Sequence, residues 1–288
     1  MQRPASCARW LAVLCCAAII TMAAPPLLGQ TSFNWDNGGG DGLWGTSANW
    51  APNGIPDFDD NLNLTAASLA GAQTINLAGT RSIGVLQANG VNGTYTFANS
   101  AAGGTLDVFG AAETTVIFTN TATGSLIFET DIRYRVDGRF FVNSSPTGGK
   151  ITFNAGRTIS SGAASGTSVL NLTSRNTTHL YALEVHSTIA DGPGARMALE
   201  AGFAGDAVAH VGRALVTGPN TYTGPTSVNG MTLAFNSIGN IGGGPSALGA
   251  PATLADASHG TVQKWNTLPA RQKTRETSTR AQRVPIFI

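Results

Sequence analysis

Residues 93–128 read GTYTFANSAAGGTLDVFGAAETTVIFTNTATGSLIF, and this stretch decides the fold. Four short apolar runs alternate in it with clusters of Gly, Ala, Asn and Ser; they cover residues 94–97, 105–109, 115–118 and 125–128. Each run is rich in Val, Ile, Leu, Phe and Thr, which is typical of β-strands. The chain therefore reverses or bends after every few residues, as Gly and Asn permit.

Similar runs extend on both sides of this stretch, at residues 74–77, 82–86, 139–142, 150–153 and 169–172. The apolar parts of successive runs begin at Tyr95, Leu106, Val116, Leu126, Phe140 and Ile151. The steps between these positions are too short for crossover helices, so a βαβ sheet is excluded. Two all-β architectures remain: a β-solenoid with about two runs in each rung, and a β-sandwich. The solenoid is favoured.

An Asn closes many of the runs, as at Asn99, Asn120, Asn143 and Asn154. In a solenoid such side chains can stack from rung to rung, as in cross-β ladders. Alternatively, Asn simply suits each turn. Between residues 195 and 211 there is enough Ala to allow one short helix.

Charge divides the chain into an acidic body and a basic end. Residues 31–263 carry nine Arg and Lys against fifteen Asp and Glu, a net of −6, whereas residues 264–288 carry six against one, a net of +5. The acidic body gives no electrostatic footprint for nucleic acid, and none is expected as a partner. Residues 255–288 have no apolar period, and we expect a disordered basic tail there.

Residues 1–30 are typical of a signal peptide. Arg3 and Arg9 precede an apolar segment at 10–22, and small residues and two prolines follow. An uncleaved membrane anchor is the alternative, since residues 10–29 are nearly long enough to span a bilayer. All three cysteines lie in this segment, so we expect a secreted or cell-surface protein without disulfides, and no membrane span once the signal is removed.

Residues 215–234, LVTGPNTYTGPTSVNGMTLA, resemble the autotransporter-associated β-strand repeat of exported bacterial proteins. The matching positions are Asn220, Thr221, Tyr222, Gly224, Thr226, Val228, Thr232 and Leu233, and Leu248-Gly249 supplies the pair that follows the repeat. Met231 stands where that family usually has Gly. The Trp-rich segment 35–56 resembles the opening module of many proteins that carry such repeats. The resemblance implies a right-handed parallel β-helix at the cell surface or beyond, and this chain resembles a truncated member.

Trp35, Trp44 and Trp50 are the candidate ligand-binding residues. Spaced among glycines, they could form an aromatic face on which sugar rings stack. The alternative is an aromatic cluster that caps the open end of the solenoid. Extracellular polysaccharide or cell-surface components are the expected partners.

Two alternating polar segments are candidates for a metal site or a reactive site. Asp57, Asp59, Asn61 and Asn63 superficially resemble a calcium loop, but Leu62 and Ser68 stand where such a loop needs Gly and Glu, so no metal is expected. The second segment, 131–139, predicts a half-buried strand whose charged outer face pairs with itself; its members are Asp131, Arg133, Arg135, Asp137 and Arg139. A polysaccharide lyase or hydrolase using Asp131 and Asp137 is one alternative function.

We thus expect four segments: a signal peptide at 1–30, a Trp-rich N-terminal cap at 31–70, a β-solenoid at 71–254 with one clear repeat at about 215–250, and the tail at 255–288. The expected function is that of an exported structural or adhesive protein without catalysis or a cofactor. A carbohydrate-binding surface module is the other alternative.

Overall fold

The computed structural model describes residues 31–250 except 66–67, 90–92, 101–103, 111–113, 120–123, 136, 178 and 204–210. The expected signal peptide and basic tail lie outside the described residues. Within them the chain is almost entirely β-structure, and the helix there is a single 3-10 turn at Ser47–Asn49.

The described strands form three sheets that run along the molecule. The largest has the order β2 (Trp50–Ala51), β1 (Ser32–Trp35), β3 (Asn61–Thr65), β6 (Val85–Asn89), β9 (Thr114–Thr119), β12 (Gly138–Ser144), β15 (Thr167–Ser174), β18 (Arg196–Gly202) and β20 (Thr226–Asn229). The second has the order β21 (Thr232–Phe235), β19 (Arg213–Val216), β16 (Leu183–Val185), β13 (Ile151–Phe153), β10 (Gly124–Glu129), β7 (Gly93–Ala98) and β4 (Gly71–Asn76). The third has the order β17 (Thr188–Ala190), β14 (Thr158–Ser161), β11 (Asp131–Tyr134), β8 (Thr105–Val108) and β5 (Arg81–Ile83).

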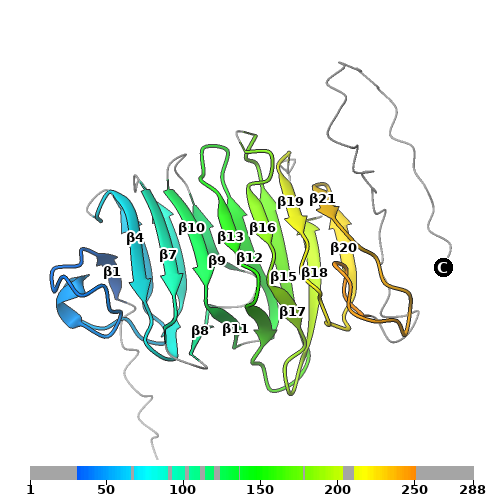
Figure 1. Cartoon of the computed structure of the whole chain (residues 1–288), viewed down its shortest axis with the longest axis horizontal. Helices are drawn as coiled ribbons and strands as arrows, with labels where there is room; N and C mark the ends of the chain where they lie inside the picture. The colour runs from blue at the N-terminus through cyan, green and yellow to red at the C-terminus, as the bar shows by residue number, and fades with distance from the viewer. Residues whose placement is uncertain are drawn as a thin grey trace, which may run out of the picture.

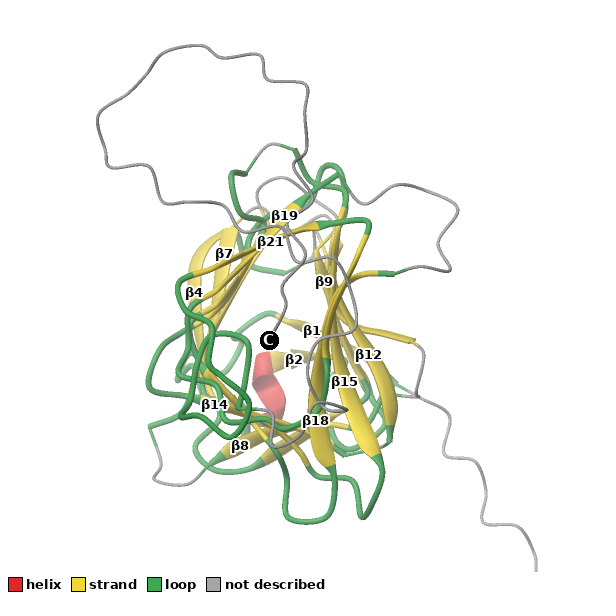
Figure 2. Cartoon of the chain, turned by 90° about the vertical axis from the view of Figure 1, so that its right-hand side faces the viewer, coloured by secondary structure: helices red, strands yellow, loops and turns green. Residues whose placement is uncertain are grey.

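Successive turns of the chain stack in parallel. In the second sheet Tyr95 pairs with Leu126, Leu126 with Ile151, and Ile151 with Leu183, so equivalent residues of four turns lie in one row. The turns from β3 to β17 each contribute one strand to each of the three sheets, and the turn from β18 to β20 contributes none to the third sheet. The strands lie side by side along the long axis (Figure 1) and surround the core when viewed down that axis (Figure 2). The fold is a parallel β-solenoid, as expected, and the sandwich alternative is wrong because its strands would pair antiparallel.

Period-2 alternation fills the interior, because every second residue of a strand points inward. Phe97, Phe128 and Phe153 stack in consecutive turns, with ring centroids 5.3 and 4.9 Å apart and planes inclined by 14° and 13°. All three rings are buried. Equivalent inward positions therefore form continuous columns, which give each turn most of its packing partners in the turns above and below it.

The structure corrects the expected number of strands in a rung, which is three and not two in the five rungs from β3 to β17. Residues 82–86, expected to be one run, contain the corner at Gly84 between β5 and β6. Residues 131–139 likewise divide between β11 and β12. Sequence alternation continues across such corners, so it did not reveal them.

The structure differs from the sequence expectations in two further places. The Ala-rich stretch at 195–211 starts as strand β18 and not as a helix, because it pairs with both β15 and β20; residues 204–210 lie outside the described residues. The parallel sheet begins before residue 71, since β1 pairs with β3 and β3 with β6. The segment 31–70 thus contributes strands as well as a cap.

Two of the asparagines that close runs bond to residues of other types in neighbouring turns. Asn154 donates to the Glu129 carboxylate at 3.0 Å, and the side-chain oxygen of Asn99 accepts the N–H of Gly79 at 3.3 Å. An Asn pair occurs elsewhere, where Asn89 donates to Asn63 at 3.1 Å. Asn120 lies outside the described residues.

Candidate functional site

The three tryptophans lie together inside the N-terminal end of the solenoid. Trp35 and Trp44 each pack edge-on against Trp50, with centroids 4.9 and 5.0 Å away, and all three side chains are 0% exposed. The indole N–H of Trp50 donates to the Trp44 carbonyl at 2.8 Å, and that of Trp44 donates to Pro56. A sugar ring needs an exposed aromatic face, and these rings offer none. The interpretation as a ligand platform is therefore wrong in this structure, and the cluster serves as an end cap.

The cap is closed by β2, which turns back antiparallel to β1 so that Trp50 lies opposite Trp35. Asn49 anchors the loop that makes this turn. Its side chain is buried, accepts the N–H of Gly39 at 2.9 Å, and donates to Asp41 and to the Leu43 carbonyl. Thr46 also donates to Asp41, at 2.6 Å. These donors lower the pKa of Asp41 from its ordinary value, Thr46 contributing most.

The residues that resemble the autotransporter-associated repeat occupy structural positions in the last two described turns, from β19 to β21. The buried Asn220 side chain accepts the N–H of Ile189 at 2.6 Å and donates to the Ala247 carbonyl at 2.7 Å. Tyr222 is buried and bonds through its hydroxyl to Thr226. Asn220 and Tyr222 therefore fix the course of the chain where no strand ladder does so.

The remaining positions of this motif set corners and fill the core. A Cβ at Gly224 would lie 2.3 Å from the Met197 carbonyl oxygen of the preceding turn, so only Gly fits there. Leu233 is buried, and Val228 packs against the core. Met231 packs inward at 6% exposure, and the corner before Thr232 is made by Gly230, whose φ is +78°. The motif describes how one turn stacks on another and brings no reactive groups together.

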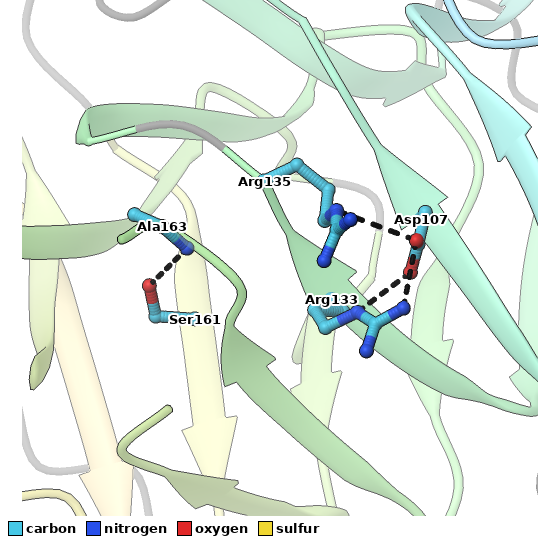
Figure 3. Close-up of polar contacts among 5 residues, drawn as sticks. All are labelled: Asp107, Arg133, Arg135, Ser161 and Ala163. Carbon is cyan, nitrogen blue, oxygen red and sulfur yellow. Dashed lines mark hydrogen bonds and ion pairs between the residues drawn. The ribbon is translucent and has the colours of Figure 1, made fainter. Parts of the chain in front are cut away.

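The most prominent charged group lies on the outer face of the third sheet, at β8 and β11 (Figure 3). Arg133 binds Asp107 with two 2.8 Å hydrogen bonds, from Nε to Oδ1 and from Nη2 to Oδ2. Arg135 approaches the same carboxylate only at 3.5 Å, from Nε to Oδ2. The Asp107 side chain is 6% exposed and both arginine side chains are 35% exposed. Its hydrogen bond to Asp107 raises the pKa of Arg133 above its ordinary value, so the Arg133 guanidinium stays charged.

An aromatic pair continues this group along the axis. The Arg135 guanidinium lies over the Phe109 ring, 5.5 Å from its centroid, and Phe58 meets Phe109 edge-on at 4.9 Å. Phe58 is 54% exposed. We name the set Asp107, Arg133, Arg135, Phe109 and Phe58 the arginine–phenylalanine face.

Gly162 lies in the next turn, and because it has no side chain, the side chains of Arg133 and Arg135 can pack against its backbone. A Cβ at this position would lie 2.7 Å from Cδ of Arg135 and 2.8 Å from Cγ of Arg133. The corner that carries Gly162 is fixed from inside, where the Ser161 hydroxyl accepts the Ala163 N–H at 3.2 Å (Figure 3). The same hydroxyl contacts the Ser168 hydroxyl at 2.8 Å.

A second polar group crosses the outer face of the largest sheet. Glu200 is only 6% exposed and accepts from Arg139 at 2.6 Å, from Asn171 at 2.7 Å and from Asn229. The Arg139 guanidinium also lies 5.0 Å from the Phe203 ring centroid. This group joins four neighbouring strands, β12, β15, β18 and β20, and both oxygens of its carboxylate accept hydrogen bonds.

A third group lies on the second sheet. His186 contacts the Thr217 hydroxyl through Nδ1 at 2.7 Å and the Glu184 carboxylate through Nε2 at 3.2 Å. This order of groups resembles an activated nucleophile. The oxygen that faces the imidazole is, however, also bound to Lys150 at 2.7 Å, which offsets its charge. These contacts link three turns of the solenoid, through residues in or beside β13, β16 and β19.

The charged residues expected at 131–139 face outward but do not pair among themselves. Arg133 and Arg139 find acidic partners in other turns, at Asp107 and Glu200. Asp131 and Asp137, proposed as carboxylates of an enzyme, each accept a backbone N–H of the following turn, from Thr158 at 2.8 Å and Thr167 at 3.0 Å. The lyase or hydrolase alternative thus gains no support from them.

Sequence reasoning missed Asp107 and Glu200. The sequence does contain a signal for both. Asp107 is the only charged residue of its strand, TLDV, and Glu200 is the only charged residue of its strand, RMALEAG, apart from the first. No group of three or more His, Cys, Asp or Glu in the described part of the chain is placed to hold a metal ion. Within the same part, no helix is long and apolar enough to cross a membrane. Comparison with family models gives no match, and comparisons with curated proteins and with solved structures give none either.

Proposed function

We propose that this chain is an exported bacterial surface or secreted protein whose β-solenoid has a structural or adhesive role and performs no catalysis. The observation that carries the proposal is the way the outward polar side chains are used. In the three charged groups described above, most charged members are bound to a partner in another turn, as Arg133 is to Asp107 and Arg139 is to Glu200. Such a surface is rigid and extended, as binding a large partner requires.

The sequence supports the export part of this proposal. Arg3 and Arg9 followed by the apolar residues 10–22 form a signal-like N-terminus, and every cysteine of the chain precedes residue 17. A body without cysteine needs no disulfide chemistry after export, because the ladders and core columns supply its stability. The resemblance of residues 215–234 to the autotransporter-associated repeat supports the same location.

Fractionation of bacteria that express the full chain tests export. We expect the protein outside the cytoplasm, with a mature N-terminus between residues 24 and 31 when sequenced. The variant Leu14→Arg, which interrupts the apolar segment, should stay in the cytoplasm at full length. Parent protein that remains in the cytoplasm would overturn the proposal.

The adhesive part is tested with the same two strains. Cells that export the parent should attach more strongly to a polysaccharide-coated surface than cells with Leu14→Arg, at equal protein levels. Equal attachment by the two strains would leave only a structural role.

A further inference from the structure

We propose that the arginine–phenylalanine face binds the carboxylate groups of an acidic polysaccharide, with Arg135 as the principal contact. This inference rests on the proposed function, since such polymers lie outside the cell. It deepens that function by naming the chemistry of the partner.

Charge is the first argument. The face holds two guanidinium groups and one carboxylate. Both carboxylate oxygens of Asp107 accept a 2.8 Å hydrogen bond from Arg133. Arg135 has only the 3.5 Å contact with the same carboxylate. Its remaining N–H groups are available on a side chain that is 35% exposed, whereas Asp107 is almost covered. An approaching ligand therefore meets the uncompensated edge of a guanidinium group, which binds planar carboxylates through paired hydrogen bonds.

Preorganisation is the second argument. Binding usually costs the conformational entropy of a long side chain such as Arg. Here the Arg135 guanidinium lies over Phe109, and the aliphatic part of the side chain lies against Gly162. These two contacts already restrict the side chain in the absence of a ligand, so less entropy remains to be lost when a carboxylate binds.

The third argument is the apolar neighbour. Phe58 is 54% exposed and is held against Phe109 at 4.9 Å. A uronic acid residue carries a carboxylate on a ring whose C–H groups form an apolar face, and aromatic rings pack against such faces. Asp57 and Asp59 flank Phe58 in the sequence and Asp60 follows them, so we expect the polymer to extend away from these carboxylates, toward β14.

Binding is measured with the full chain, purified from whichever fraction holds it, by titration with polygalacturonate, with neutral dextran and with dextran sulfate. We expect polygalacturonate to bind, with an affinity that falls as salt is added, and dextran not to bind. Stronger binding of dextran sulfate than of polygalacturonate would overturn the assignment of a carboxylate ligand.

Three variants locate the site. Arg135→Gln should weaken polygalacturonate binding about tenfold, the loss expected for one charge-assisted contact. Arg213→Gln is the matched control, because it removes one positive charge from an exposed position on β19 in another sheet. Gly162→Ala keeps every charge but displaces both arginine side chains, so it should weaken binding as well.

An equal loss in Arg135→Gln and Arg213→Gln would show that net charge and not this face controls binding, and would overturn the inference. If Gly162→Ala binds polygalacturonate as the parent does and has the same thermal unfolding midpoint, the argument that the arginine side chains are preorganised for binding is overturned. Because these titrations use purified protein, their failure is distinguishable from a failure of export, which fractionation reports.

Discussion

The hydroxyl of Tyr222 bonds to the hydroxyl of Thr226 within the core near the C-terminal end of the solenoid, whereas the buried hydroxyl of Tyr134 has no partner among the described residues. Burial raises the pKa of both phenols, so both are neutral at ordinary pH. The two tyrosines thus differ in whether a buried polar group is satisfied.

This difference predicts opposite responses to removal of the hydroxyl. Tyr222→Phe should lower the free energy of unfolding by about 1 kcal/mol, because it breaks a buried hydrogen bond. Tyr134→Phe should not lower it and should raise it by up to about 1 kcal/mol, since an unsatisfied group is removed. Urea unfolding followed by far-ultraviolet circular dichroism measures both. A larger loss in Tyr134→Phe would mean that its hydroxyl is bonded.

The aromatic column gives a second prediction. Phe128 lies between Phe97 and Phe153, so Phe128→Ala removes two stacked contacts and leaves a cavity. We expect a loss of about 3–5 kcal/mol in unfolding free energy. Phe58→Ala, at a ring that is 54% exposed, is the control and should cost less than about 1 kcal/mol. Similar losses in the two variants would contradict the assigned core.

The spacing between turns gives a third prediction. Gly224→Ala places a methyl group 2.3 Å from the Met197 carbonyl oxygen, a backbone atom that cannot move aside without breaking the 2.9 Å bond from the Gly224 N–H. We expect destabilisation by about 1–3 kcal/mol. Gly244→Ala meets no atom within 4 Å and should be neutral or raise stability by about 0.4–1 kcal/mol. Thermal unfolding of the two variants decides the matter, and equal midpoints would count against this stacking.

Acid should loosen the N-terminal cap through Asp41. The folded pKa of this carboxyl is lowered, so its contribution to stability is present above the pKa of the unfolded state and is lost as pH falls through the folded value. We expect the fluorescence of the buried tryptophans to change below about pH 4. Asp41→Asn should make this change smaller. A change of undiminished size in Asp41→Asn would assign it to another carboxyl.

The strands of the body were predictable because their apolar residues alternate. Residues 94–97 and 125–128, for example, became the parallel neighbours β7 and β10. The corners were harder to predict. The residues of β11 and β12 form one alternating run in the sequence, although β11 belongs to the third sheet and β12 to the largest. The turns also differ in length, since the turn from Leu126 to Ile151 is shorter than the turn from Ile151 to Leu183. Sequence inspection therefore had no fixed period to detect.

The charged groups could not be predicted, because they depend on which strands become neighbours. Arg133 and Asp107 belong to different turns, and Arg139 and Glu200 lie still further apart in the sequence. Only the parallel register brings these residues together, so a pairing within the run 131–139 seemed simpler. The role of the tryptophans was undecided for a related reason: their burial depends on the antiparallel return of β2.

The parallel stacking of turns has a mechanical consequence. The hydrogen bonds between β7, β10 and β13 run roughly along the long axis, at right angles to the strands. Tension applied between the two ends of the solenoid would act on all layers of these bonds in series, so the weakest layer would break first. The turns would then separate one after another, and the body would absorb work over a long extension before it unfolded completely.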